Sequence, residues 1–291
     1  MFKIINKQIL SKQIKRLDVL APNIAQKILP GQYISLRADQ SDESIPLAVV
    51  DHDKVRGTIT LIIREVGPTT NKLGAMAIKD EIFSILGPLG VPSNIEKKGV
   101  VVCVATGIGT AQILPICRGL KEAGNRVIGI IGAKTKTSVL LESQMRLACN
   151  KLLIATEDGS YERKGLAADI LKLLIENDKI NQVHAIGSVD MMLAICQMTK
   201  VKKIKTFVHL NPVMTDCMGM CGSCRVKVGG KLVLACIEGP EFDGHKVDFD
   251  DYKIRLNAYK EQVWDNQKKL SNQNKSEPRT LMRFLSDILR K

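Results

Sequence analysis

Residues 99–111 of this 291-residue chain read Gly-Val-Val-Val-Cys-Val-Ala-Thr-Gly-Ile-Gly-Thr-Ala, and this stretch decides the fold class. Its first half is a continuous apolar run, as expected of a parallel strand that is buried on both faces. The turn that follows contains Thr106, Gly107, Gly109 and Thr110 and opens a helical pattern. Glycines at such a turn let the backbone approach a dinucleotide pyrophosphate at the helix N-terminus. Because the full six-residue fingerprint is absent, a tight turn without a ligand remains an open interpretation.

The same alternation continues downstream. Apolar runs at 126–132, 151–155, 182–187 and 205–210 alternate with helical patterns, which predicts a parallel sheet built from βαβ units. Ligands of open α/β sheets bind at the carboxyl ends of the strands. The candidates at those ends are Asp158, Gly187, Asp190 and Met191. Lys134 and Lys136 could contact a 2′-phosphate or be solvated charges, so NAD and NADP both remain open.

Upstream, residues 1–95 are rich in strand signals. Short apolar stretches such as 33–36, 47–50 and 58–66 are separated by Gly, Pro and Asp turns. Short strands with regular turn signals predict a small antiparallel barrel.

Toward the C-terminus, four of the eight cysteines fall within residues 217–236. Clustering of this kind points to a metal site rather than to disulfides in a cytosolic chain. With Asp216 in first place, Cys221, Cys224 and Cys236 reproduce the C-x4-C-x2-C…C spacing of plant-type iron–sulfur clusters. The spacing therefore predicts a [2Fe–2S] cluster held by Asp216, Cys221, Cys224 and Cys236.

The hairpin around Gly229-Gly230 explains where the last cysteine lies. Two glycines between alternating runs are a strong signal for a two-residue hairpin. Pairing outward sets Val228 opposite Lys231 and Cys224 opposite Ala235. Cys236 is then one step beyond, beside Cys224.

Three alternatives to this ligand set remain open, and one of them is that these cysteines bind no metal. A four-cysteine zinc site would use Cys217, although zinc sites usually contain two paired cysteine motifs. The first ligand of an iron–sulfur cluster is a separate question, because spacing favours Asp216 whereas the softness of a thiolate favours Cys217.

Composition excludes several classes of protein. The net charge is +13, but residues 253–291 contribute ten Lys/Arg and four Asp/Glu, and no cluster of aromatic residues accompanies the rest, which argues against nucleic-acid binding. No apolar run is long enough for a membrane helix or a signal peptide, so we expect a cytoplasmic protein without a membrane partner. The remaining cysteines, at 103, 117, 149 and 196, are expected to be buried free thiols.

The residues of the cysteine region carry a resemblance to a known family. Gly-Met-Cys-Gly-Ser-Cys-Arg-Val at 219–226 and Ala-Cys-Ile-Glu-Gly-Pro-Glu-Phe-Asp-Gly-His at 235–245 resemble the small subunit of NADH-dependent reduced ferredoxin:NADP oxidoreductase. That family is also called sulfide dehydrogenase subunit and is similar to the electron-transfer subunit of dihydroorotate dehydrogenase. The resemblance covers about residues 1–252, and in the family an aspartate takes the first ligand place, which matches Asp216.

The resemblance implies a β-barrel plus α/β architecture: a ferredoxin-reductase-like antiparallel FAD barrel, a parallel-sheet nicotinamide domain and a small [2Fe–2S] hairpin module. We place the boundaries at 1–97, 98–210, 211–252 and 253–291, the last segment being a basic helical tail. That tail carries an apolar stripe at Leu281, Phe284, Leu285, Ile288 and Leu289, which could pack on this chain or on a partner.

The resemblance also implies flavin-binding residues. The first flavin motif of the family, Arg-x-Pro-Leu-Thr, corresponds to Ser44-Ile-Pro46-Leu47-Ala48, so its Arg and Thr are missing here. A cation at this place pairs with the pyrophosphate of FAD, and Arg64 could replace it. The alternative for Arg64 is a solvent-exposed strand charge. The flavin candidates are Pro46, Leu47, Ala48, Ile62, Ile63, Arg64, Gly67, Thr69 and Thr70.

The function implied is an electron-transfer subunit that moves electrons between NAD(H), FAD and a [2Fe–2S] cluster. The implied partner is a larger flavin and iron–sulfur subunit, which forms a heterodimer that couples to NADP(H) and ferredoxin by electron bifurcation. A third possibility serves dihydroorotate or sulfide instead. A reading of another class is a binding or regulatory module that has lost flavin, motivated by the residues at 44 and 48.

Overall fold

In the computed structural model, residues 1–258 are described. The chain divides into two compact units, Met1–Phe249 and Asp250–Lys291. Every sheet of the described residues belongs to the first unit, whereas helix α8, Phe249–Asn257, lies almost wholly in the second. The apolar stripe expected at 281–289 lies outside the described residues. Among the described helices, none is long and apolar enough to cross a membrane.

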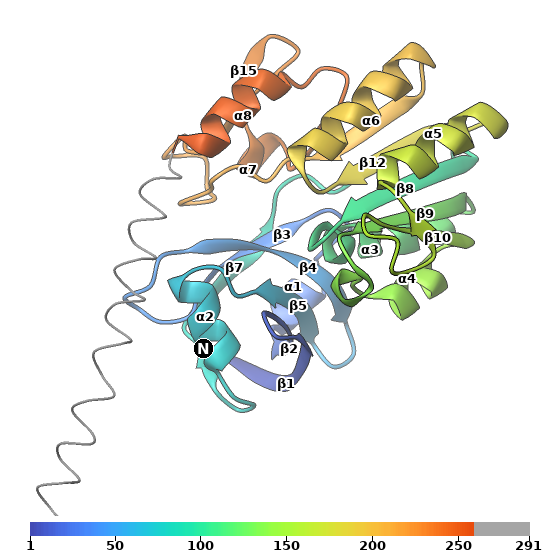
Figure 1. The fold of residues 1–291 in the computed structure, drawn as a ribbon. Coiled ribbons are helices and arrows are strands. Elements are labelled where there is room, and N and C mark those ends of the chain that lie inside the picture. The colour runs from blue at the N-terminus through green and yellow to red at the C-terminus, as the bar shows by residue number, and fades with distance from the viewer. Residues whose placement is uncertain (259–291) are drawn as a thin grey trace, which may run out of the picture. The chain divides into compact units, whose positions relative to one another are not determined.

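The N-terminal part is an antiparallel, nearly closed barrel, drawn in blue in Figure 1. Its strand order is β6-β1-β2-β5-β4-β3-β7. The elements are β1 (Phe2–Ser11), β2 (Ile14–Leu20), α1 (Pro22–Ala25), β3 (Tyr33–Arg37), β4 (Ile45–Asp53), β5 (Thr58–Arg64), α2 (Pro68–Ala75), β6 (Glu81–Ile82) and β7 (Ser84–Leu89). The predicted antiparallel barrel is thus confirmed.

Alternation along β5 shows how the barrel sorts its side chains. Ile59, Leu61 and Ile63 are fully buried in the barrel core. Ile62, between them, packs instead with the core of the α/β part. Because successive strand residues face opposite sides of a sheet, one strand serves two cores.

The α/β part follows, in green and yellow in Figure 1, as a seven-stranded sheet of order β11-β10-β9-β8-β12-β13-β16. Its strands pair in parallel except β16, which pairs antiparallel with β13. The elements are β8 (Val100–Thr106), α3 (Gly109–Glu122), β9 (Arg126–Ala133), a short 3-10 helix (Lys136–Ser138), α4 (Glu142–Ala148), β10 (Lys151–Thr156), β11 (Arg163–Lys164), α5 (Ala167–Asn177), β12 (Gln182–Ile186), α6 (Val189–Val201) and β13 (Lys205–His209). The predicted parallel sheet is confirmed.

The core of this part is apolar and contains the scattered cysteines. Cys103, Cys117 and Cys149 pack in one cluster with the branched residues of β8 and α3. Cys196 is also buried, and all four are free thiols, as expected. Burial raises the pKa of Cys196 to about 12, so this thiol stays protonated at neutral pH.

The last part of the first unit is the hairpin that carries the cysteines. It consists of β14 (Arg225–Val228), β15 (Lys231–Leu234), the one-turn helix α7 (Ala235–Glu238) and β16 (Glu241–Asp243). Gly229 and Gly230 both have positive φ, as the two-residue turn requires. Strand β16 then joins the parallel sheet beside β13 and anchors the hairpin to the α/β part.

Candidate functional site

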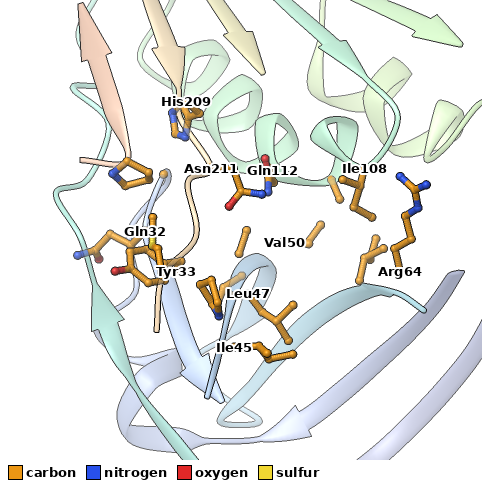
Figure 2. A pocket seen from close by; sticks show the side chains of 18 of the residues that line it. Gln32, Tyr33, Ile45, Leu47, Val50, Arg64, Ile108, Gln112, His209 and Asn211 are labelled. Carbon is orange, nitrogen blue, oxygen red and sulfur yellow. The ribbon is translucent and has the colours of Figure 1, made fainter. Parts of the chain in front are cut away.

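A cavity of about 320 Å³ lies between the barrel and helix α3. Figure 2 shows Ile108 and Gln112 facing Ile45 and Leu47 across it, with Tyr33 and Arg64 toward its two ends. Concave, mostly apolar sites with a few polar groups are the usual places for organic cofactors. The cavity draws on both folded parts of the first unit, which fits a ligand shared between them.

One face of α3 forms the upper wall of the cavity. The lining residues Ile108, Ala111, Gln112 and Pro115 recur at the spacing of one helix face. Pro115 has no amide hydrogen, so it cannot donate the usual helical bond to the carbonyl of Ala111. The Ala111 carbonyl therefore lacks the helical hydrogen bond from residue 115. Ala111 itself lines the cavity.

The flavin candidates divide between lining and non-lining residues. Those that line the cavity are Pro46, Leu47 and Ala48 on β4, Ile62 and Arg64 on β5, and Thr70 on α2. Ile63 does not, because its side chain is fully buried in the barrel core. Arg64 is both exposed and a lining residue, so the structure is compatible with a phosphate partner and with a solvated charge.

The turn at Gly67 begins helix α2. The Thr70 hydroxyl accepts from the amides of Val66 and Gly67, at 3.0 and 2.9 Å, and donates to the Gly67 carbonyl. Thr69 is buried beside it. The Thr70 hydroxyl is thus occupied by hydrogen bonds within the turn. The groups that could bind an anion here are the amides in the first turn of the helix.

The turn after β8 packs against the turn after β12. Gly107 has a φ of +56°, and a Cβ on Gly109 would lie 2.5 Å from the carbonyl oxygen of Ile186. A Cβ on Gly187 would lie 2.0 Å from the Thr106 hydroxyl and 2.8 Å from Met191. The structure therefore brings four of the nicotinamide candidates, Thr106, Gly109, Gly187 and Met191, into one close-packed group.

Thr110 is the second residue of α3 and is fully buried. Among the described residues its hydroxyl has no hydrogen-bond partner, which makes it a polar atom open to a ligand. A free hydroxyl at the start of a helix after a Gly-rich turn fits a nucleotide site.

Of the two acidic candidates, Asp158 lies apart from this group, whereas Asp190 precedes Met191 in the chain. Asp158 is exposed beyond β10, two strands away from β8, and its carboxylate accepts from the amide and hydroxyl of Ser160 at 3.0 and 2.7 Å. These bonds lower the pKa of Asp158. Asp190 is exposed in the first turn of α6. Lys136, one of the two candidates for a 2′-phosphate, lies over the ring of Tyr161.

The cysteine hairpin has the register expected from its sequence. Val228 pairs with Lys231, Arg225 pairs with Leu234, and the Ala235 amide donates to the carbonyl of Cys224 at 3.1 Å. The difference from expectation comes after Leu234, where the chain leaves the strand and Cys236 is carried by the single turn of α7. Cys236 still meets Cys224, since their side chains are hydrogen bonded.

The loop before the hairpin separates the two first-ligand candidates. The Asp216 carboxylate accepts from the amides of Met218, Met220 and Cys221, at 2.9, 3.1 and 2.6 Å, and these bonds lower its pKa. The Cys217 side chain is buried and bonds instead to Ser35 of the barrel strand β3. Cys217 has a φ of +61°, a strained value for a residue with a Cβ.

The donor set of this loop and hairpin fits an iron–sulfur cluster. The Gly219 amide donates to the sulfur of Cys236, and the Ser223 amide to that of Cys221, and such N–H bonds to sulfur are typical of these sites. Burial raises the pKa of the Cys236 thiol to about 12, so its thiolate needs a nearby cation. Within residues 1–258, no three His, Cys, Asp or Glu side chains form a group that could hold a single metal ion. The choice of individual ligands stays a prediction.

Tyr33 connects the cavity and the cysteines, and sequence reasoning missed it. It lines the cavity, is 5% exposed, and donates from its hydroxyl to the carbonyl of Cys236 at 3.0 Å. The other lining residues missed include His209, Asn211, Met214 and Pro240. They end or follow β13 or precede β16, and only the fold brings them to the barrel.

Comparison with known proteins places the chain in a family. Residues 211–248 match the model of the iron–sulfur cluster binding domain of dihydroorotate dehydrogenase B, which confirms the iron–sulfur module expected there.

Two curated relatives match most of the chain. The chain is 40% identical over 269 residues to an uncharacterized protein of Clostridium beijerinckii, covering 89% of this chain and 91% of that protein. It is 35% identical over 260 residues to the dihydroorotate dehydrogenase B (NAD(+)) electron transfer subunit homolog of Thermotoga maritima, covering 89% and 92%.

A solved structure is similar over nearly the whole chain. It is the NADH-dependent reduced ferredoxin-NADP oxidoreductase, studied for flavin-based electron bifurcation, with a TM-score of 0.87, 33% identity, and coverage of 93% of this chain and 98% of that one. Together with the relatives, it confirms the family resemblance and the ferredoxin-reductase type of fold. This chain belongs to the family of dihydroorotate dehydrogenase B electron transfer subunits and their homologues.

Proposed function

We propose that this chain is an electron-transfer flavoprotein subunit that moves electrons between NAD(H), FAD and a [2Fe–2S] cluster. The observation that carries the proposal is the position of Tyr33, which lines the cavity and bonds to the main chain of Cys236. A flavin in the cavity and a cluster on the hairpin would have this one side chain between them. That proximity is what electron exchange between two cofactors requires.

The flavin would be held by the barrel side of the cavity. Pro46, Leu47 and Ala48 supply an apolar wall on β4, and Ile62 continues it on β5. Arg64 supplies a cation at the cavity's edge, where it would replace the arginine missing at position 44 in binding the pyrophosphate. Gly67 begins α2 and donates its own amide to the Thr70 hydroxyl, so Thr69 and Thr70 in the first turn would supply amides for the same phosphates.

The nicotinamide dinucleotide would be held at the carboxyl edge of the parallel sheet. The Thr106–Thr110 turn and the N-terminus of α3 would meet its pyrophosphate. Gly187 and Met191 close the other side of that turn. We infer NAD(H) as the cofactor, with NADP(H) as the alternative, because the relatives are named for NAD(+).

When bound, the nicotinamide and flavin would supply hydride transfer and the cluster would supply single-electron transfer. The chain's own residues position these groups and exclude water. Apolar side chains from β4, β5 and α3 line the cavity, which lowers the local dielectric and strengthens the field of any charge inside it. Asp216, Cys221, Cys224 and Cys236 would ligate the cluster. An aspartate, being a hard ligand, would alter its potential relative to four thiolates.

We propose a larger flavin and iron–sulfur subunit as the partner. Around the cysteine loop, Met218, Met220 and Ile237 are 53, 84 and 49% exposed, and Ile237 lies against Gly219. Exposed apolar side chains in one place are typical of protein interfaces. By its similarity to the bifurcating enzyme, the complex would couple NAD(H), NADP(H) and ferredoxin.

A second candidate is supported by the names of other relatives and of the matched domain. These are electron transfer subunits of dihydroorotate dehydrogenase B. In that case the same cofactors would serve a partner that acts on dihydroorotate.

The test is to purify the full chain from its native cells without oxygen, together with whatever subunit accompanies it. Flavin and iron content are measured first, and then activity with NADPH plus ferredoxin and with dihydroorotate. Flavin, iron and ferredoxin-dependent reduction of NADP support the proposal. Activity with dihydroorotate alone supports the second candidate, and a protein free of flavin and iron refutes both.

A further inference from the structure

Where strand β16 meets the cavity wall, the described residues contain a buried group of titratable side chains centred on Glu241. The Glu241 side chain is 9% exposed, and its partners His184 and His209 are 0 and 7% exposed. A single carboxylate oxygen, Oε2, lies 3.1 Å from His184 Nδ1, 2.9 Å from His209 Nε2 and 2.9 Å from Ser93 Oγ. Buried charges are rare and persist only when they are fully hydrogen bonded.

One placement of the protons gives each contact of Glu241 a donor and an acceptor. The amide of Gln182 lies 2.6 Å from His184 Nε2 and donates to it, so the remaining ring proton of His184 is on Nδ1 and points to Glu241. His209 donates from Nε2 and Ser93 from its hydroxyl. Three donors converge on one oxygen, which requires the carboxylate to be ionised. Replacing it with an amide puts a donor or a weaker acceptor where all three donors meet.

The partners of Glu241 come from separate parts of the first unit. Ser93 lies between the barrel and the parallel sheet, and His184 is on the inner strand β12. His209 is the last residue of β13 and lines the cavity. Glu241 is the first residue of β16, so its hydrogen bonds connect that strand to the wall of the cavity.

The segment before Glu241 leads directly back to the cysteines. Between Cys236 and Glu241, the carbonyl of Gly239 accepts from the Val91 amide at 2.7 Å, and that of Pro240 accepts from the Leu210 amide at 2.9 Å. Pro240 itself lines the cavity. Only four residues thus separate a predicted cluster ligand from the buried carboxylate, and two of them are hydrogen bonded to the elements that enclose the cavity.

We propose that Glu241 is a positioning residue that fixes segment 236–241, and with it the cluster ligand Cys236, against the wall of the flavin cavity. The inference rests on the proposed function for its two cofactors, but the fixing of the segment is a property of the chain itself. Tyr33 holds one end of the segment at Cys236, and Glu241 holds the other.

The test uses the full chain with Glu241→Gln, which keeps the shape of the side chain and removes its charge. Ser93→Ala is a milder second variant that removes one donor and leaves the charge. Glu142→Gln is the matched control, because Glu142 also bonds a cation and a hydroxyl, Arg146 and Tyr161, but its side chain is 29% exposed at the start of α4.

The first readout is amide hydrogen exchange in peptides that contain Val91, Leu210 and residues 236–243. Loss of a buried hydrogen bond to a charged group should speed exchange there about tenfold or more in Glu241→Gln, by a smaller factor in Ser93→Ala, and not in the control. Exchange in β2 and β5 of the barrel should stay the same. Unchanged exchange in the segment overturns the proposal, whether or not cofactors are bound.

The second readout is the EPR spectrum of the reduced cluster together with the visible spectrum of the flavin. If Glu241 positions Cys236 and the cavity wall, both spectra should change in the two variants at full iron and flavin content. A lower melting temperature with both spectra unchanged would show a merely structural role and overturn the proposal. Absence of iron and flavin from the unmodified chain would instead refute the proposed function, while the exchange measurement would still decide the role of Glu241.

Discussion

Two glycines of helix α3 provide a paired test of the packing that builds the nicotinamide turn. Gly109 is the first residue of the helix, and a Cβ there would lie 2.5 Å from the carbonyl oxygen of Ile186 and 2.9 Å from its carbon. Both are main-chain atoms at the end of β12, so they cannot move aside without shifting an inner strand. Gly119, ten residues along the same helix, has its nearest neighbour at 3.4 Å, the side chain of Ile95.

The expected effects on the free energy of unfolding have opposite signs. Gly109→Ala should destabilise the chain by about 1 to 3 kcal/mol, as overpacked sites do. Gly119→Ala should stabilise it by about 0.5 to 1 kcal/mol, because alanine restricts the unfolded chain and favours a helix interior. The two variants should therefore differ by roughly 1.5 to 4 kcal/mol, although each adds one methyl group to one helix.

Urea unfolding followed by circular dichroism measures this difference, and NADH titration gives the companion result. Gly109→Ala should also weaken NADH binding, since the displaced turn is the proposed pyrophosphate site, whereas Gly119→Ala should leave binding unchanged. Equal changes in stability for the two variants, or a Gly109→Ala chain as stable as the unmodified one, would refute the packing argument.

Three further predictions concern the cofactors and pH. Asp216→Ala should lose the cluster and Cys217→Ala should keep it, as measured by iron content, and the reverse pattern would make Cys217 the ligand. Arg64→Ala should weaken flavin binding by roughly 10- to 100-fold, because one charge-assisted hydrogen bond is lost. Arg56→Ala, in the exposed β4–β5 turn, should leave flavin binding unchanged. Retention of flavin by the Arg64 variant would contradict the proposed phosphate contact. Burial alone would raise the pKa of Glu241, but hydrogen bonds from its two histidine partners hold it below the ordinary value of 4.5. The contribution of the Glu241 carboxylate to stability is therefore present above pH 4.5 and is lost as the pH falls below it. The difference in Tm between the unmodified chain and Glu241→Gln should shrink on acidification below that pH. A widening difference would contradict an ionised Glu241.

Local patterns predicted the larger features of this fold. The apolar run at 100–106 and its successors gave the parallel sheet, because strands buried on both faces need continuous apolar sequence. Gly229-Gly230 gave the hairpin and its register, because a two-residue turn fixes which residues face each other. Both depend on neighbours in the sequence.

Features that depend on distant contacts were not accessible in the same way. Tyr33 and Cys236 are 203 residues apart, and nothing in either segment indicates that they meet. The antiparallel addition of β16 to a parallel sheet has only three residues of sequence, too few for a periodic signal. The three partners of Glu241 likewise come from separate segments of the chain.

The flavin candidates show the same division within one motif. Strand alternation separates Ile62, which lines the cavity, from Ile63, which faces the barrel core, but the choice of face requires knowing where the second domain packs. At the start of α3, the sequence motif indicated the Gly-rich turn as the binding site. The residues that line the cavity instead lie along one helix face, from Ile108 to Pro115.

The central claim is that electrons pass between NADH, a flavin in the cavity and a [2Fe–2S] cluster on the hairpin. Its most direct test is anaerobic titration of the full chain with NADH, followed by visible absorbance and low-temperature EPR. The account predicts that NADH bleaches the flavin bands and that the EPR signal of a reduced [2Fe–2S] cluster appears. A chain that contains both cofactors but shows no reduction by NADH, while dithionite reduces both, would contradict it.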